Sequence, residues 1–174
     1  MHAIQVAILA VVALALSAGA ALAQQASIYN LTPQFSAPFR CAPAFTGRIQ
    51  HVEGYTCGTS NRVSYTAAYP VQRVNFGNLS ERDILQTHIQ ATMQLNVRPQ
   101  ISVLQEFRVG RYTAMSYLAR YETRQAPGTT LEKYGIVIIN SNGIYSWSVT
   151  GVVGVSAQEA RADFYALMSN VVVR

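Results

Sequence analysis

The stretch that most limits how this chain can fold is residues 98–153, where apolar and polar side chains alternate with a period of two. Ile101, Val103 and Phe107 begin the pattern, and Gly110 interrupts it once. Beyond the interruption, the two expected faces carry Met115, Tyr117, Ala119 and Tyr121 on one side, and Tyr112, Ala114, Ser116 and Leu118 on the other. Such alternation predicts consecutive strands with two distinct faces.

The same stretch contains a hairpin turn at Ser141-Asn142-Gly143, flanked on both sides by β-rich runs. An Asn-Gly pair tolerates the positive φ angles that tight hairpin turns need. Shorter runs at 45–52 and 62–76 also predict strands, and Pro70 in the second run marks an edge strand or a bulge. An antiparallel sheet should therefore dominate the fold.

Two segments change from the strand period to the helix period. Ser80, followed by Asp83 three residues later, is a typical helix start, and this helix should end before Pro99. Its stripe is predicted to contain Leu85, His88, Ile89, Thr92, Met93 and Asn96. Ser156 and Glu159 repeat the capping spacing before a C-terminal helix. Its predicted face contains Ala160, Phe164, Leu167, Met168 and Val171. The fold class is α+β, an antiparallel sheet with two amphipathic helices packed against it.

The N-terminal residues 1–23 carry no formal charge, are mostly apolar and end in Ala21-Leu22-Ala23. This pattern predicts a signal peptide cleaved after Ala23, and hence a periplasmic or secreted protein. The apolar run approaches the ~20 residues that span a bilayer, so an uncleaved membrane anchor is the alternative. Residues 24–39 contain two prolines and no clear period, which predicts an extended N-terminal arm before a single α+β domain at 40–174.

The charge of the chain suits an acidic partner, because thirteen basic residues face eight acidic ones and give a net charge of +5. The arginines are scattered and nowhere form a run of three. A phosphate-binding stripe needs clustered basic residues, and an exported protein does not meet nucleic acid in the cell. We therefore expect no nucleic-acid partner.

Cys41 and Cys57 are the only cysteines. An even number of cysteines in an exported chain predicts a disulfide, and closing a loop of this length contributes ~3 kcal/mol of stability. The separation is not the CxxC spacing of redox enzymes. The alternative is a metal site of Cys41, His51 and Cys57, with Glu53 as a fourth ligand, although this spacing matches no closed zinc pattern. We predict no cofactor.

Catalytic constellations are scarce. After residue 23 the chain has two histidines, His51 and His88, and two aspartates, Asp83 and Asp163. Both aspartates fall in the first turns of predicted helices, where a negative charge favours the helix dipole. His88 is predicted to be a core or boundary residue, with a general base as the alternative. Nucleophile-elbow and phosphate-loop motifs are absent from the sequence, so we expect a protein that is not an enzyme; an unrecognised hydrolase is the remaining alternative.

The order of elements resembles the PsbP-like fold family of small exported accessory proteins. The likeness lies in the aromatic strand at 62–76, the capped helix from Ser80, the strands of 98–153, and the closing helix that ends LMSNVVV. It implies a non-catalytic accessory or assembly role. It carries no site residues to this chain because no motif matches, and the cysteine pair is an addition to the family pattern.

Tyrosine is unusually frequent, with ten residues. Because tyrosine and arginine are enriched at binding hot spots, Tyr117, Arg120, Tyr121 and Arg124 are predicted to form a recognition face on the sheet. Ordinary half-buried sheet tyrosines are the other interpretation.

Two functions follow from these patterns. The first is an exported non-catalytic binding or accessory protein of the bacterial cell envelope, which binds another envelope protein through this tyrosine and arginine face. The alternative is a periplasmic small-molecule or metal carrier with a cleft near His51 and the cysteine loop. A hydrolase would instead bring a histidine within hydrogen-bond reach of a serine and a carboxylate.

Overall fold

A computed structural model describes residues 25–174 of the chain. Its main element is a seven-stranded antiparallel sheet with the strand order β3-β4-β5-β9-β8-β7-β6. The strands are β3 (Ala44–Ile49), β4 (Val52–Gly58), β5 (Ser64–Pro70), β6 (Val97–Val109), β7 (Tyr112–Thr123), β8 (Ala126–Asn140) and β9 (Gly143–Val152). A second sheet has the order β1-β2-β10 and consists of β1 (Ser27–Thr32), β2 (Phe35–Phe39) and β10 (Val172–Val173). The helices are α2 (Glu81–Met93), α3 (Ala157–Leu167) and the 3-10 turn η1 (Met168–Asn170).

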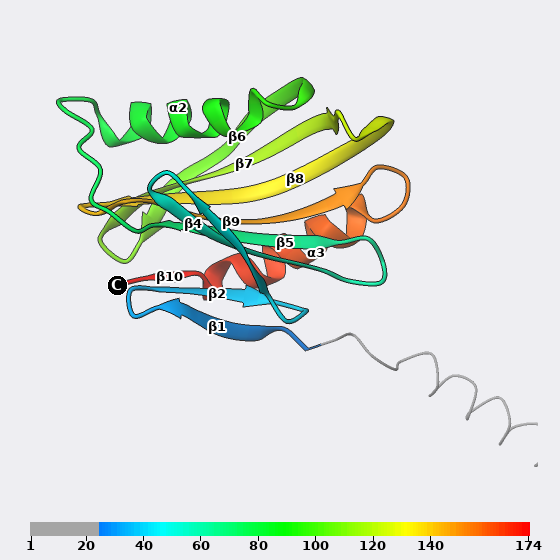
Figure 1. The fold of residues 1–174 in the computed structure, drawn as a ribbon, viewed down its shortest axis with the longest axis horizontal. Helices are drawn as coiled ribbons and strands as arrows, with labels where there is room; N and C mark the ends of the chain where they lie inside the picture. The colour runs from blue at the N-terminus through cyan, green and yellow to red at the C-terminus, as the bar shows by residue number, and fades with distance from the viewer. Residues whose placement is uncertain (1–24) are drawn as a thin grey trace, which may run out of the picture.

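The large sheet is the middle layer of the molecule (Figure 1). Helix α2 packs on one face, over β7 and β8, whereas α3 and the small sheet lie on the opposite face. Each face has its own core. The core under α3 is centred on Trp147, Tyr65, Phe35, Phe39 and Phe164, and the core under α2 on Leu85, Ile89, Met93 and Met115. The α+β class predicted from the sequence is confirmed, and its two helices lie on opposite faces of the sheet.

Helix α2 starts as predicted. The Ser80 hydroxyl accepts a hydrogen bond from the Asp83 backbone N–H at 3.2 Å, so Ser80 is the N-cap. The helix buries Ile84, Leu85, Ile89 and Met93 against the sheet.

Helix α3 starts after Ser156 as predicted, but without the predicted capping bond. The Ser156 hydroxyl makes no capping bond to the helix; it accepts from the Val152 N–H at 3.0 Å and donates to the Arg62 carbonyl at 2.9 Å. The chain turns so sharply from β9 into α3 that any side chain at Gly151 would collide with the Ser156 backbone. The hydroxyl is therefore used to hold this turn, and the predicted capping box is wrong.

The β8–β9 hairpin turn is confirmed. Asn140 pairs with Gly143, so Ser141 and Asn142 form the loop, and Gly143 takes the positive φ of 149°. The Asn140 side-chain carbonyl accepts from the backbone N–H groups of Asn142 and Gly143, at 2.8 and 3.2 Å. This amide fixes the turn.

Residues 25–39 are folded, whereas the sequence predicts an extended arm at 24–39. Residues 27–39 form the β1–β2 hairpin, and Phe35, Ala37 and Phe39 are fully buried. The indole N–H of Trp147 donates to the Pro38 carbonyl at 2.8 Å. The hairpin is part of the core, so a boundary at residue 40 falls inside the fold. Its buried strand β2 is only five residues long and contains a proline, a pattern that is also typical of a loop.

The predicted signal peptide, residues 1–23, lies outside the described residues. Within residues 25–174, no helix combines the length and the apolar character needed to cross a membrane.

Candidate functional site

A groove of about 690 Å³ lies at the N-terminal end of α2. Three segments form its walls: the loop between β5 and α2, the first turn of α2, and the end of the β8–β9 hairpin. Its lining residues are Arg73, Val74, Asn75, Phe76, Gly77, Glu81, Ile84, Ile139, Asn140 and Ser141.

The loop wall is tied to the hairpin wall. The Val74 N–H donates to the Asn142 carbonyl at 3.0 Å. A Cβ at Gly143 would lie 2.9 Å from the Pro70 side chain, so the glycine allows the two segments to approach this closely. The groove is thus formed by packed backbone segments.

Both asparagine side chains of the groove have their carbonyl oxygens already bonded. The Asn75 oxygen accepts from the Gly77 N–H at 2.9 Å, and the Asn140 oxygen accepts from the two backbone groups of the hairpin turn. These bonds fix the orientation of each amide and leave both NH₂ groups as free donors. Arg73 adds a guanidinium that takes part in none of the ion pairs within residues 25–174.

The rest of the lining is a carboxylate, the Ser141 hydroxyl and a set of apolar side chains. Glu81 accepts a hydrogen bond from the Thr113 hydroxyl, which anchors the first turn of α2 to β7. Phe76, Ile84 and Ile139 provide the apolar surface. The groove therefore offers several donors, a carboxylate, the Ser141 hydroxyl and an apolar wall, a combination that suits a small polar ligand with an apolar part.

The predicted tyrosine and arginine face does not form as one surface. Tyr117 is only 4% exposed, and its ring lies across Gly135, where any side chain would collide with it. Tyr121 points to the same side of β7, into the surroundings of the α2 core. Arg120 lies on the opposite side, where its Nε donates to Glu132 at 2.6 Å, and Arg124 is exposed in the β7–β8 turn. Residues an odd number apart on a strand face opposite ways, so the four residues cannot share one side.

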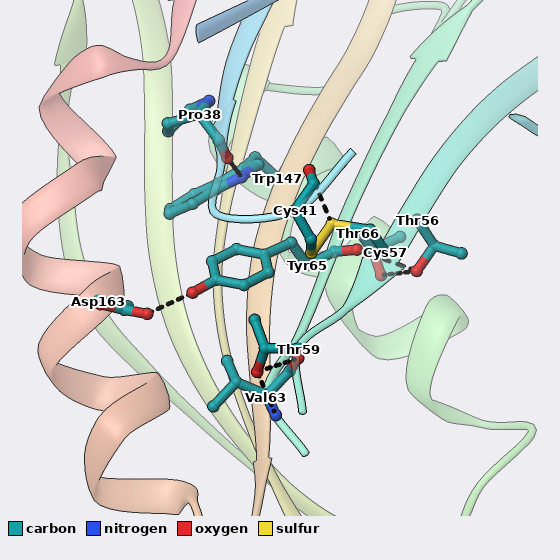
Figure 2. Close-up of a disulfide and its surroundings, with 10 residues drawn as sticks. All are labelled: Pro38, Cys41, Thr56, Cys57, Thr59, Val63, Tyr65, Thr66, Trp147 and Asp163. Carbon is teal, nitrogen blue, oxygen red and sulfur yellow. Dashed lines mark hydrogen bonds between the residues drawn. A yellow bond between two sulfur atoms is a disulfide. The ribbon is translucent and has the colours of Figure 1, made fainter. Parts of the chain in front are cut away.

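The α3 side of the sheet contains a buried polar network that the sequence analysis missed. Asp163 is 6% exposed, accepts from the Tyr65 hydroxyl, and pairs with the Arg40 Nε at 2.8 Å. Figure 2 shows Asp163 reaching from α3 toward the Tyr65 ring. Burial, and then the bond to this carboxylate, raise the pKa of Tyr65. Asp163 lies three residues after Ala160, on the predicted apolar face, and that position was the signal that it is buried.

The cysteine prediction is confirmed. Cys41 and Cys57 form a disulfide with their Cα atoms 5.9 Å apart, close to the Tyr65 ring (Figure 2). Because each sulfur is bonded to the other, the alternative metal set of Cys41, His51 and Cys57 is wrong. Among residues 25–174, no three His, Cys, Asp or Glu side chains gather as a metal site.

The groove is not where a carrier cleft was expected. None of its lining residues belongs to the cysteine loop, and His51 is exposed in the turn between β3 and β4.

Comparison with known proteins yields structural likenesses only. No protein-family model matches the chain, and no curated protein matches its sequence. Its fold is similar to that of PA94 from Pseudomonas aeruginosa, a protein of unknown function, with a TM-score of 0.50 and 13% identity over 86% of this chain and 98% of that one. A weaker likeness is to LpqN of Mycobacterium tuberculosis, which is involved in cell envelope biogenesis, with a TM-score of 0.45 and 7% identity over 86% and 90% of the two chains. These likenesses concern the fold alone, and the PsbP-like resemblance stays a prediction.

The described part of the chain contains two histidines, His51 and His88. Within the described part of the chain, neither ring forms a hydrogen bond with another side chain. Burial, and then the charge of Lys133, lower the pKa of His88, so its ring is neutral at pH 7. His88 is partly buried on α2, as the sequence predicts for a boundary histidine.

Proposed function

We propose that this protein is a non-catalytic binding protein that works outside the cytoplasm and holds a small polar molecule in the groove at the N-terminal end of α2. The observation that carries this proposal is the set of free donors in the groove: the Arg73 guanidinium and two amide NH₂ groups whose orientation the backbone fixes. The disulfide supports the location, since disulfides persist in oxidising compartments.

The donors define the ligand in chemical terms. Three neighbouring donor groups match a ligand with several acceptor oxygens, and a guanidinium favours a carboxylate among them. Phe76, Ile84 and Ile139 provide contact for an apolar part of the ligand. The isolated histidine rings support binding without catalysis, because general-base chemistry needs a base within hydrogen-bond reach of its target.

The test is thermal unfolding of the full chain in the presence of small carboxylates, amino acids and sugars, each added separately. A ligand that binds only the folded state raises Tm, and the rise continues to grow with ligand concentration above Kd. We expect at least one carboxylate-bearing compound to raise Tm, and Arg73→Gln to abolish this rise. Arg161→Gln is the matched control, because it removes the same charge from an exposed position on α3. The proposal is wrong if no compound raises Tm, or if Arg73→Gln responds like the wild type.

A protein partner is the second candidate function, and the edge strand β6 favours it. This strand is thirteen residues long, ends the large sheet, and exposes Val103 and Leu104 by 46% and 41%. An unpaired edge with apolar side chains can accept a strand from another protein. A photo-crosslinking residue at position 104 should capture one defined envelope protein, whereas the same residue at Ile49, an exposed apolar position on β3, should not.

A further inference from the structure

Lys133 is the only lysine in the chain, and it lies in the middle of β8 on the α2 side of the sheet. Its cross-strand neighbours are Ala119 on β7 and Thr150 on β9. The side chain is partly buried, and this burial lowers the pKa of its ammonium group. A charged group in such a position costs free energy unless a partner compensates it.

No carboxylate of the described chain compensates this charge. All eight acidic residues are bonded elsewhere: Glu53 to Tyr69, Glu81 to Thr113, Asp83 to Ser80, Glu106 to Arg82, Glu122 to the Gly128 N–H, Glu132 to Arg120 and Tyr134, Glu159 to Asn61, and Asp163 to Arg40 and Tyr65. Lys133 takes part in none of the ion pairs or side-chain hydrogen bonds of residues 25–174. Lys133 therefore has no counter-charge within this part of the chain.

Small hydroxyl side chains lie on the β9 side of Lys133, on the same face of the sheet. Cross-strand partners share a face of the sheet, and the register continues from Lys133 through Thr150 to Ser64 and, in the next row, from Gly135 through Ser148 to Thr66. We call Ser64, Thr66, Ser146, Ser148 and Thr150 the hydroxyl shelf. Helix α2 packs over β7 and β8, whereas Ser64, Thr66 and Ser146 on the neighbouring strands remain partly exposed.

The shelf has unused hydrogen-bonding capacity. Among the described residues, the hydroxyls of Ser64, Ser146 and Ser148 bond to no other residue. On the other side of Lys133, the ring of Tyr117 lies over Gly135, and Tyr121 lies beside Thr150. Because Tyr121 hydrogen-bonds to Thr150, the unused hydroxyls of the shelf are those of its serines.

We propose that Lys133 and the hydroxyl shelf bind the carboxylate of a polyhydroxylated molecule, such as a sugar acid. One ammonium group balances one negative charge, which a carboxylate carries; a phosphate dianion would bring a second charge next to the buried tyrosine rings. Hydroxyl side chains both donate and accept hydrogen bonds, as the hydroxyls of such a ligand require.

This site is distinct from the groove at α2. Lys133 and Asn140 lie seven residues apart on β8. At ~3.4 Å per residue this places them roughly 24 Å apart, so one small ligand cannot reach both. Each site can fail or succeed in its own test.

The only lysine of the chain is also the ideal probe. When the full chain is grown on ¹³C-labelled lysine, its NMR spectrum contains a single Cε–Hε signal from lysine, that of Lys133. We expect D-glucuronate to move this signal saturably, with glucose at equal concentration producing less than about a tenth of the shift. Phosphate and acetate separate the two parts of the proposal, since phosphate has the charge without the carboxylate and acetate has the carboxylate without the hydroxyls.

Variants supply the second readout, the calorimetric affinity for D-glucuronate. Lys133→Gln should weaken binding by ~10-fold or more, as expected for the loss of a charge-assisted hydrogen bond. Ser148→Ala should weaken it less, and Arg161→Gln, which removes the same charge on the α3 side, should leave it unchanged. Absence of a saturable shift with D-glucuronate, an equal shift with phosphate, or equal affinities of Lys133→Gln and the wild type would each overturn the proposal.

Discussion

The two faces of the large sheet differ in whether their buried charges are paired within the fold. On the α3 face, Asp163 is paired with Arg40 and Tyr65, and Glu132 with Arg120 and Tyr134. On the α2 face, Lys133 has no acidic partner in the described chain, and the serines next to it have no side-chain partner there.

This difference separates stability from binding. Polar groups that satisfy one another within the fold hold it together and have no capacity left for a ligand. Polar groups left without partners lower stability, and a protein retains them where they serve a function. We infer that the α3 face stabilises the fold and that the α2 face binds. Substitutions on the two faces should then change the free energy of unfolding in opposite directions and by different amounts.

The largest effect is expected on the α3 face. Phe164 is fully buried and stacks on Trp147, with ring centroids 5.8 Å apart. Phe164→Ala should lower the free energy of unfolding by ~3–5 kcal/mol, because it removes an aromatic ring and leaves a cavity. Tyr165→Ala, at a residue 53% exposed, is the control and should cost less than ~1 kcal/mol. Denaturant titration measures both, and equal losses would contradict the assignment of α3 to the core.

Loss of the disulfide should lower the free energy of unfolding somewhat less than Phe164→Ala does. Cys41→Ser combined with Cys57→Ser opens a loop whose ends are sixteen residues apart, and should cost ~3 kcal/mol. Reduction of the wild type should lower its free energy of unfolding by a similar amount. Because reduction breaks the crosslink without introducing serine, it shows how much of the loss comes from the crosslink alone. If neither protein loses more than ~1 kcal/mol, the disulfide is not a structural constraint on the α3 side.

The sequence was most informative where structure depends on local contacts. Ser80 caps α2 through a neighbour three residues away, and Asn140 and Gly143 form a turn between adjacent strands, so local patterns identified both elements. Ser156 was misread because its hydroxyl bonds to Arg62, far away in the sequence. A local motif gives no information about a partner that only the tertiary fold supplies.

The candidate sites show the same limit. Tyr117 and Arg120 were grouped by type, although the alternation of the strand already placed them on opposite faces. The sequence does not identify Lys133 as a site residue, because a single lysine forms no motif. It becomes a candidate site only when the register of β5, β8 and β9 places Thr150 beside it and Ser64 one strand further, on the same face.

On the α2 face, we expect a substitution that increases the free energy of unfolding, in contrast to the losses expected on the α3 face. Lys133→Met should raise the free energy of unfolding at pH 7 by up to about 1 kcal/mol, because an apolar side chain of similar length replaces an uncompensated charge. Since burial lowers the pKa of Lys133 in the folded state, the unfolded state binds more protons between that pKa and 10.5. The wild type therefore gains stability as the pH rises through this window, and the advantage of the variant should shrink toward pH 10.5. Denaturant titrations at pH 7, 9 and 10 measure it, and destabilisation at pH 7 would mean that Lys133 has an internal stabilising role.

The smallest effect concerns His88, whose pKa is lowered first by burial and then by the charge of Lys133. Below pH 6.5 the unfolded state takes up a proton that the folded state does not, so this residue makes the wild type less stable as the pH falls from 6.5 toward 5. His88→Gln should flatten that part of the stability profile while leaving the stability at pH 7.5 nearly unchanged. In Lys133→Met, which keeps His88, stability should also fall less steeply between pH 6.5 and 5 than in the wild type. The reason is that one of the two causes of the lowered His88 pKa is gone. If the slope is the same with and without Lys133, the two residues do not sense each other, and the α2 face does not hold the uncompensated charge on which its contrast with the α3 face depends.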